Sequence, residues 1–372
     1  MLGLAQLFTS GLFAWNLDAN LRRRRRLWLR FDESDSFIIP QWTMAIPVRN
    51  EEKNIARLEE ELSEQRYLPE KIIFLNDQSQ DKTSDAIASL KAKLAKVDVR
   101  EISGEALPSS WRGKIWALQQ LLNSVESPYV LFMDADVSLL HPNALKSLYV
   151  DAMPFLEKRK CNFVSVFPKP DVKGSTALVV DQIYMHLFFF LPFFWEKMKS
   201  ASAVAGCGQV MLINVEELKR RGFLSLISGS THDGLQLARC FKGLDGSAPF
   251  FDGSAAFSCA YYPNLSAAFK GLSRNSWEAD GNIGVSLVVS SLLFWNFVLP
   301  YVLLPFLLWN PAFLAAFLAM LWAQLRLAEE LGLNRSHVFL APVKAMAAIG
   351  VHLWSPLRLK LGLDQQWKGR AV

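Results

Sequence analysis

The sequence predicts an α/β domain with a parallel-type sheet, followed by helices that enter a membrane. In the first two thirds of the chain, apolar strand-like runs alternate with helix-like stretches, and polar residues follow the apolar runs. This alternation is typical of doubly wound domains, in which helices cover both faces of a sheet. Near the C-terminus, apolar segments are long enough to cross a bilayer.

Composition narrows the class of protein further. Of the 372 residues, 51% are hydrophobic, which is high for a soluble protein and favours membrane contact. The four cysteines have no Cys-x-x-Cys spacing, so we expect them to be reduced rather than part of a disulfide framework. The five histidines form no cluster, which argues against a zinc site.

The N-terminal segment, residues 1–30, is expected to contact the membrane. Residues 2–15 are apolar, and residues 22–26 are all arginine. The apolar run is shorter than the roughly 20 residues of a full span, and its positive charge follows it, whereas a signal peptide carries the charge first. Two interpretations remain: a short or tilted anchor with the arginines in the cytoplasm, or an interfacial helix. No nucleic-acid partner is expected, because the arginines lack an aromatic platform.

The first elements should be strands that each lead through a polar turn into a helix. Asn50 is expected to cap a helix that runs to about Gln65, with Glu51 and Glu52 favourable in its first turn. A second helix should start at Asp81 and another at residues 111–114. The expected strands before the middle of the chain cover residues 43–48, 71–75, 97–102 and 129–133, and another follows at 163–168.

The stretch at residues 129–137 organises the prediction of a site. Five apolar residues run directly into Asp134 and Asp136. The carboxylates then fall at the C-terminal end of a buried strand, where open α/β sheets bind ligands. An Asp-x-Asp pair suits Mg²⁺ or Mn²⁺, whose coordination a diphosphate can complete. The same spacing also occurs in an ordinary polar turn, so the assignment depends on neighbouring motifs.

Four motifs occur in a specific order along the chain. They are Pro47-Val48-Arg49-Asn50-Glu51, Asn76-Asp77-Gln78-Ser79, Gly113-Lys114 and Asp134-Ala135-Asp136. In this order and spacing the chain resembles the family 2 glycosyltransferases, which are inverting enzymes with the Rossmann-like GT-A fold that binds nucleotide diphosphosugars. The resemblance covers about residues 43–246. Residues 107–117 are similar to the subgroup of hopanoid and carotenoid pathways, whose acceptors are expected to be lipids.

The resemblance implies roles on the donor side of the site. The expected nucleotide-binding residues are Pro47, Arg49, Asn50, Glu51, Asp77, Lys114 and Asp134. Carboxylate acceptors suit a base edge and ribose hydroxyls, and Lys114 at a helix start would offer a cation to the diphosphate. Asp134 and Asp136 would hold the divalent cation, which is the expected cofactor.

On the acceptor side, the resemblance places Asp233 at the catalytic base. Gly206 and Gly208 would line the sugar pocket, and His232 stands where the family has an acid. In an inverting displacement one carboxylate removes the acceptor proton, while a metal neutralises the leaving diphosphate. If the acceptor is itself a carboxylate or phosphate, Asp233 would instead orient it. Asp233 also fits a simple helix N-cap.

Residues near the membrane region indicate how many sugars are transferred. Residues 273–278 lack the Gln-x-x-Arg-Trp sequence of processive synthases, which favours transfer of one sugar. Arg274 is expected near the diphosphate or a lipid headgroup, or else as an ordinary charge flanking a span. Residues 177–195 are read either as an amphipathic segment at the membrane face or as an internal core helix.

The C-terminal third should contain the membrane helices. Residues 283–309 and 311–325 are expected to cross as a hairpin, and residues 337–354 cross, re-enter or lie flat. The expected domains are 1–30, 40–282, 283–357 and a basic tail at 358–372.

The sequence as a whole predicts a multi-pass enzyme of the cytoplasmic membrane whose catalytic domain faces the cytoplasm. It would move one hexose from a nucleotide sugar, with UDP favoured, to a lipid such as a carotenoid or hopanoid-like terpenoid. The alternatives are transfer to polyprenyl phosphate or a glycerolipid, and a non-catalytic membrane protein that binds nucleotide sugars.

Overall fold

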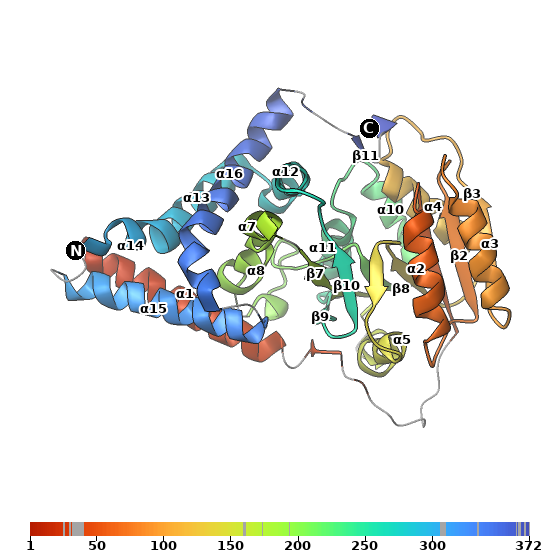
Figure 1. Ribbon diagram of the computed structural model, residues 1–372, viewed down its shortest axis with the longest axis horizontal. Helices are drawn as coiled ribbons and strands as arrows, with labels where there is room; N and C mark the ends of the chain where they lie inside the picture. The colour runs from red at the N-terminus through yellow and green to blue at the C-terminus, as the bar shows by residue number, and fades with distance from the viewer. Residues whose placement is uncertain are drawn as a thin grey trace. The chain divides into compact units, whose positions relative to one another are not determined.

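The computed structural model forms two compact units (Figure 1). The sheet unit comprises Leu27–Asp171, Glu196–Ala260 and Gln365–Val372, and the helical unit comprises Met1–Arg26, Val172–Trp195 and Tyr261–Asp364. The units are interleaved along the chain, whereas the sequence suggested consecutive domains. The described residues are 1–24, 27–29, 31, 41–158, 161–172, 174–192, 194–305, 310–332, 335–361, 363, 366–367 and 370–371.

A seven-stranded mixed sheet is the centre of the sheet unit. Its strands lie in the order β3-β2-β1-β4-β8-β6-β9. Their bounds are β1 Trp42–Val48, β2 Lys71–Asn76, β3 Asp98–Ser103, β4 Tyr129–Met133, β6 Phe163–Phe167, β8 Val210–Asn214 and β9 Phe250–Asp252. The first four strands are parallel, and β8 pairs antiparallel with β4 and β6. Every residue of β1 is buried, as expected for a strand covered on both faces.

Helices cover this sheet, and their bounds are α2 Glu52–Ser63, α3 Thr83–Lys93, α4 Gly113–Ser124, α5 Ala144–Ser147, α6 Met153–Lys158, α9 Val215–Arg221, α10 Phe223–Leu226 and α11 Asp233–Asp245. A short π-helical turn, Leu148–Ala152, joins α5 to α6. Helix α2 buries Ile55, Leu58 and Leu62, which recur at helical spacing. These helices confirm the expected alternation of strands and helices.

The expected capping of α2 is wrong. Its N-cap is Glu51, and no side chain caps it. Asn50 instead has φ of 55°, and its side-chain oxygen accepts a hydrogen bond from the Gln80 amide at 2.8 Å. Asn tolerates this left-handed conformation because its short side chain can bond nearby backbone.

A second, three-stranded sheet was not predicted from the sequence. It consists of β5 Val137–Leu139, β10 Phe257–Ala260 and β7 Lys169–Asp171 in that order. Strand β5 follows Asp136 directly and pairs antiparallel with β10. The turn that carries the two carboxylates is therefore held between a strand of each sheet.

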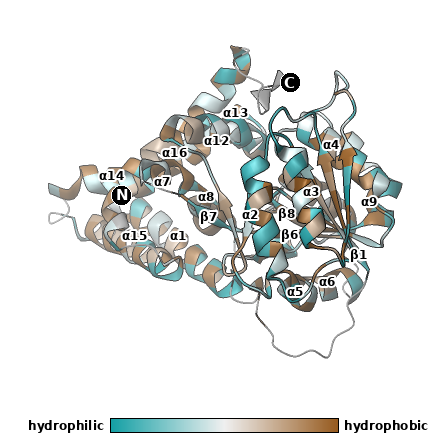
Figure 2. Ribbon diagram, turned by 45° about the vertical axis from the view of Figure 1, so that its right-hand side comes forward, coloured by the Kyte–Doolittle hydropathy of each residue, from teal (hydrophilic) through white to brown (hydrophobic). Residues whose placement is uncertain are grey.

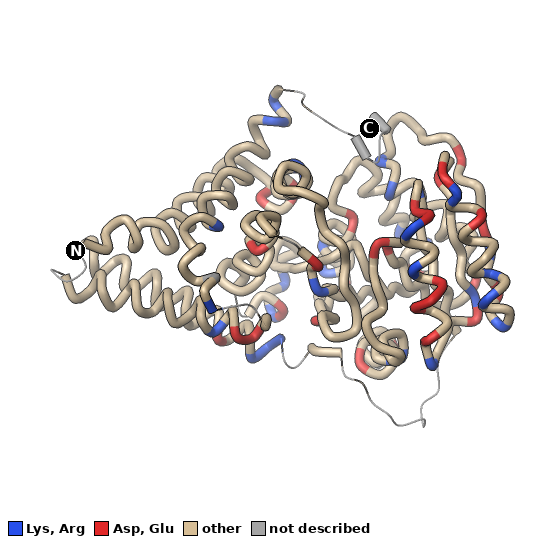
Figure 3. The backbone as a smooth tube through the Cα atoms, in the orientation of Figure 1, with Lys and Arg blue, Asp and Glu red and all other residues tan. Residues whose placement is uncertain are grey.

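The helical unit contains the membrane candidates. Its helices include α1 Leu2–Arg24, α7 Ala177–Val180, α8 Gln182–Met185, α12 Leu265–Asp280, α13 Ile283–Leu293, α14 Leu299–Val302, α15 Pro311–Glu330 and α16 Ala341–Lys360. Three stretches are long and apolar enough to cross a membrane: Ile283–Val302, Pro311–Glu330 and Val338–Lys360. Figure 2 shows their apolar residues, and Figure 3 shows long uncharged stretches along α13 and α15.

The segment at residues 177–195 packs inside the helical unit. It is broken into α7, α8 and a π-helical turn, His186–Phe190. Phe188 and Phe189 are buried in one core with residues of α1 and α15. Of the two interpretations, the internal one fits this packing.

Helix α1 runs parallel to α15 and directs its polar residues inward. A Cβ on Gly3 would lie 3.0 Å from Asn310 Oδ1, and Arg24 donates to the Glu330 carbonyl at 3.1 Å, so corresponding ends of the two helices meet. The buried face carries the polar residues Gln6, Ser10, Asn16 and Asn20, and the exposed face carries Leu2, Leu4, Phe8, Leu12 and Trp15.

Candidate active site

Three neighbouring parallel strands bring the predicted donor-side motifs to one edge of the sheet. Arg49 follows β1, Asp77 follows β2, and Asp134 follows β4. The carboxyl ends of parallel strands share an edge, which is where open α/β sheets bind ligands. The Asp77 amide donates to the Val48 carbonyl at 2.8 Å, which continues the pairing of β1 and β2 into this edge.

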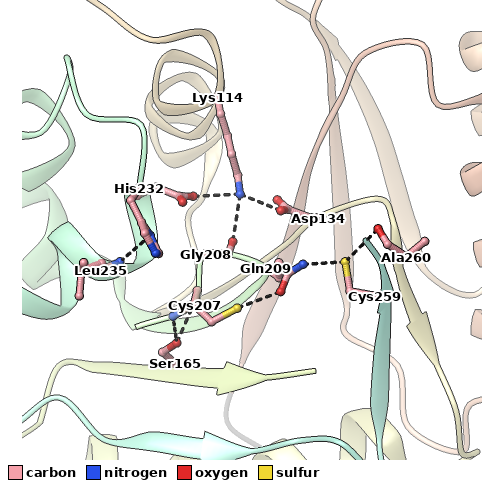
Figure 4. Close-up of polar contacts among 11 residues, drawn as sticks. Lys114, Asp134, Ser165, Cys207, Gly208, Gln209, His232, Leu235, Cys259 and Ala260 are labelled. Carbon is pink, nitrogen blue, oxygen red and sulfur yellow. Dashed lines mark hydrogen bonds and ion pairs between the residues drawn. The ribbon is translucent and has the colours of Figure 1, made fainter. Parts of the chain in front are cut away.

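Lys114 is the centre of the site (Figure 4). It is the second residue of α4, and its ammonium donates to Asp134 Oδ2 at 2.7 Å and to the Gly208 carbonyl at 3.2 Å. The same nitrogen lies 3.0 Å from Asp233 Oδ2. The predicted metal ligand and the predicted base therefore share one cation, although they lie 99 positions apart in the sequence.

Glycines allow Asp233 to reach this position. A Cβ on Gly208 would lie 2.1 Å from Asp233 Oδ1, and one on Gly206 would lie 2.3 Å from the Gly234 carbonyl. A Cβ on Gly234 would lie 2.2 Å from the Gly208 amide. The loop before β8 and the start of α11 approach each other more closely than side chains permit. Lining of a sugar pocket by Gly206 and Gly208 stays a prediction.

Burial and charge shift the protonation of the cluster. Burial raises the pKa of Asp134 to about 7, while Lys114 acts to lower it and Asp136 to raise it. Burial also acts to raise the pKa of Asp233, but the charge and hydrogen bond of Lys114 outweigh it and hold this pKa below its usual range. Asp134 and Asp233 together raise the pKa of Lys114 against its burial. Lys114 pairs with two carboxylates and its charge also acts on that of Asp136, so the three acids together favour a further cation.

The Asp-x-Asp pair fits a hard divalent cation. Asp136 Oδ1 is buried and has no hydrogen-bond partner among the described residues. No group of three or more His, Cys, Asp or Glu side chains within the described ranges is arranged to hold a metal by itself. A cation on Asp134 and Asp136 would therefore need further oxygen ligands, which water and a diphosphate supply.

The two nucleotide motifs interlock through hydrogen bonds. Arg49 donates to the Asp77 carbonyl at 2.5 Å and lies 3.7 Å from its carboxylate. The Asn50 amide donates to Ser79 Oγ at 3.0 Å, and Pro47 is paired with Leu75 in the sheet.

Glu51 is buried and turned towards its own helix. Its carboxylate accepts from Asn54 at 2.6 Å, and its amide donates to Thr83 Oγ1 at 2.9 Å. The structure brings Glu51 together with the other donor-side residues, and its binding of nucleotide stays a prediction.

His232 lies at the start of α11, whereas Arg274 lies in α12. His232 is the N-cap of α11, and its Nδ1 accepts from the Leu235 amide at 3.4 Å. Asp233 is thus not the cap, and its carboxylate forms an ion pair with Lys114 instead. Arg274 lies in α12 of the helical unit, and its place near the diphosphate or a lipid headgroup stays a prediction.

Sequence reasoning missed two sets of contacts that support the site. Arg57 of α2 donates to the carbonyls of Ala135 and Val137, which flank Asp136. Gln209 donates to Cys259 Sγ at 2.6 Å and accepts from Cys207 Sγ at 3.0 Å (Figure 4). Arg57 contacts backbone atoms, which no sequence pattern marks. Gln209 and Cys259 lie far apart in the sequence, so only the fold brings them together.

The fold is that of GT-A glycosyltransferases. The mannosyltransferase PcManGT from Pyrobaculum calidifontis, solved in complex with GDP-Man and Mn²⁺, aligns with 98% of this chain and 100% of its own, at a TM-score of 0.55 and 16% identity. At this identity the likeness concerns the fold alone.

Sequence comparisons match part of the chain to a family and to curated relatives. Residues 43–206 match the family described as Glycosyl transferase family 2, the family that the four motifs resemble. The 4,4'-diaponeurosporenoate glycosyltransferase of Staphylococcus haemolyticus is 31% identical over 129 residues, or 34% of this chain and 33% of that protein. The Staphylococcus aureus protein of that name is 34% identical over 106 residues, or 28% and 26%. The chain therefore matches a third or less of these relatives' length.

Proposed function

We propose that this protein transfers a single hexose, with inversion, from a nucleotide diphosphosugar to a lipid-soluble acceptor. The observation that carries the proposal is the position of the Lys114 ammonium, 2.7 Å from Asp134 and 3.0 Å from Asp233. One contact of this ammonium is with the donor motif and the other is with the proposed base, so the two halves of the proposed reaction would meet at this edge of the sheet.

The donor would lie along the ends of β1, β2 and β4. Asp77 offers a carboxylate to the base or ribose, and the N-terminus of α4 with Lys114 favours the diphosphate. UDP is the proposed nucleotide, and GDP is the alternative to test because the structural relative was solved with GDP-Man. Asp134 and Asp136 would hold Mg²⁺ or Mn²⁺, which when bound would neutralise the leaving diphosphate.

Asp233 would act on the acceptor. Its ion pair with Lys114 holds it ionised, so it is ready to take the proton of an acceptor hydroxyl as that oxygen attacks the anomeric carbon. The bond from the anomeric carbon to the diphosphate breaks in the same step. A carotenoid or hopanoid-like terpenoid is the proposed acceptor, supported by the partial match to enzymes named for a carotenoid acid. For a carboxylate acceptor, Asp233 would orient rather than deprotonate.

The helical unit would hold the protein in the cytoplasmic membrane with the sheet unit in the cytoplasm. Its three candidate spans support several crossings. Helix α1 has 23 residues, or about 34 Å at roughly 1.5 Å per residue. Its outward apolar face and its alignment with α15 favour an anchor over an interfacial helix. The arginines at its end, beside Glu330, would lie on the cytoplasmic side.

The proposal is tested with detergent-solubilised protein, Mn²⁺ and either UDP-glucose or GDP-mannose, with and without membrane lipid extract. Release of nucleoside diphosphate that requires metal, rises with lipid and is lost in Asp134→Ala is expected. Stimulation by polyprenyl phosphate alone would replace the terpenoid acceptor. Nucleotide binding without release from any donor would identify a non-catalytic binding protein.

A further inference from the structure

We propose that Arg57 is a positioning residue that sets the direction of Asp136 in the Asp-x-Asp turn. The inference rests on the proposed function, because it assumes that the turn binds a divalent cation together with a nucleoside diphosphate. Arg57 lies on α2, outside every motif that predicted the site, and it touches the turn only through backbone atoms.

The hydrogen bonds of Arg57 to the turn lie on either side of Asp136. A single guanidinium nitrogen of Arg57 donates to the Ala135 carbonyl at 2.9 Å and to the Val137 carbonyl at 3.0 Å. These carbonyls belong to the residues immediately before and after Asp136. With the backbone fixed on both sides, the Cα–Cβ bond of Asp136 has one direction.

The guanidinium is itself held in place by α2. Its second terminal nitrogen donates to Asn54 Oδ1 at 2.8 Å, and its Nε lies 3.2 Å from Glu61 Oε1. Glu61 also accepts from the Leu139 amide at 2.8 Å. One face of α2 thus contacts alternate residues of the turn and of β5.

The same face of α2 reaches the nucleotide motif. Asn54, which accepts from Arg57, donates to the Glu51 carboxylate at 2.6 Å. A continuous hydrogen-bonded row therefore joins the Pro-x-Arg-Asn-Glu motif to the Asp-x-Asp turn. The row would keep the nucleotide and the cation in a fixed relation, because both sites depend on one rigid helix.

Asp136 needs such support. The Asp136 carboxylate has a hydrogen bond with Cys259, but its Oδ1 is buried and accepts none from the residues that the structure describes, so the direction of this oxygen depends largely on the backbone on either side. Groups that orient metal ligands from behind typically change metal affinity or activity by about 10- to 100-fold when they are removed. An ordinary structural arginine would change stability without a selective effect on the metal.

The test compares Arg57→Ala and Arg57→Lys with Glu59→Gln in the full-length solubilised protein. Glu59 lies on the same helix but pairs with Lys93 of α3 at 3.6 Å, so it controls for loss of an α2 ion pair. Calorimetry measures Mn²⁺ affinity in the presence of UDP or GDP, and thermal unfolding is followed in parallel. Millimolar guanidinium is added to Arg57→Ala to refill the vacated position.

We expect Arg57→Ala to weaken Mn²⁺ binding about 10- to 100-fold, with partial recovery on adding guanidinium. Arg57→Lys should recover little, because an ammonium lacks the planar fork of donors. Glu59→Gln should bind Mn²⁺ as the wild type does. Equal Mn²⁺ affinity in wild type and both Arg57 variants would overturn the inference alone. A wild type that binds no Mn²⁺ with either nucleotide would overturn the proposed function, and the inference with it.

Discussion

At the scale of single residues, the site depends on the placement of one ammonium group between two carboxylates. Lys114 outweighs the effect of burial on the pKa of Asp233, whereas at Asp134 it opposes burial only in part. Removing one partner from such a buried cluster leaves uncompensated charge, and this costs more than the pair itself contributes.

Lys114→Met should therefore reduce turnover by about 100-fold or more, since a transition-state charge interaction of this kind is worth roughly 3 kcal/mol. In the proposed reaction Asp233 acts in its ionised form, and Lys114 holds the pKa of this carboxyl below its usual range. Without the lysine this pKa rises, so residual activity should be lost at higher pH. An acidic limb unmoved in kcat against pH would contradict the role of Lys114.

Gly208→Ala tests the close approach that delivers Asp233. The added Cβ would lie 2.1 Å from Asp233 Oδ1, so the carboxylate must move away from Lys114. Gly243→Ala is the matched control, because its Cβ would meet Ala201 at an ordinary 3.7 Å. Assayed side by side, Gly208→Ala should lose most of its transfer activity and Gly243→Ala should keep it. Equal activity would show that the contact is dispensable.

Residue types and spacing predicted part of the site and missed the rest for physical reasons. Asp134 and Lys114 stand at the ends of recognisable elements, so the motifs located them. Arg57 acts on carbonyl oxygens, which every residue has, and so leaves no pattern. The cap of α2 was misassigned because Asn50 is also a residue type that adopts positive φ in turns.

At the scale of elements, the long strands were predictable and the short ones were not. Strand β4 has the expected bounds. The first and last residues of β1, β2 and β3 differ from the expected ones by at most one position. Strands β5, β7 and β9 have three residues each, too few to show alternation. The antiparallel position of β8 beside β4 is a long-range pairing that local sequence does not encode.

Helix α1 holds the interrupted segment at residues 182–190 through polar contacts. Asn20 donates to the carbonyls of Phe188 and Leu191 at 3.1 and 2.9 Å, where the π-helical turn ends. Asn20→Leu would leave buried carbonyl groups with fewer donors, at a cost of about 1–3 kcal/mol. Thermal unfolding in detergent should show a lower midpoint for Asn20→Leu than for Leu12→Ala on the exposed face. A reversed order would contradict the inward direction of the polar face.

At the scale of the whole molecule, a region that matches the Glycosyl transferase family 2 model is joined in one chain to helices with membrane-spanning length. The compact units draw on separate parts of the sequence, so neither forms from one continuous stretch. Composition predicted both kinds of structure, but the assignment of residues 172–195 and 261–282 to the helical unit depends on tertiary packing.

Membrane integration gives a prediction at this scale. The three candidate spans, together with α1, should keep the full chain in the membrane pellet after an alkaline carbonate wash. Immunoblotting of pellet and supernatant measures this, with a peripheral protein of the same membranes as the control. Release of most of the protein by carbonate would indicate attachment at the surface only.

The most direct measurement follows radiolabelled sugar from the nucleotide donor into an organic-soluble product, with wild type, Asp233→Asn and Asp134→Ala compared in the same membranes. The account predicts one sugar per lipid, with the anomeric configuration inverted relative to the donor by NMR. Product formation should require Mn²⁺ or Mg²⁺ and fall at least tenfold in both variants. A product with retained configuration, or nucleotide binding without any labelled lipid, would contradict the proposed transfer.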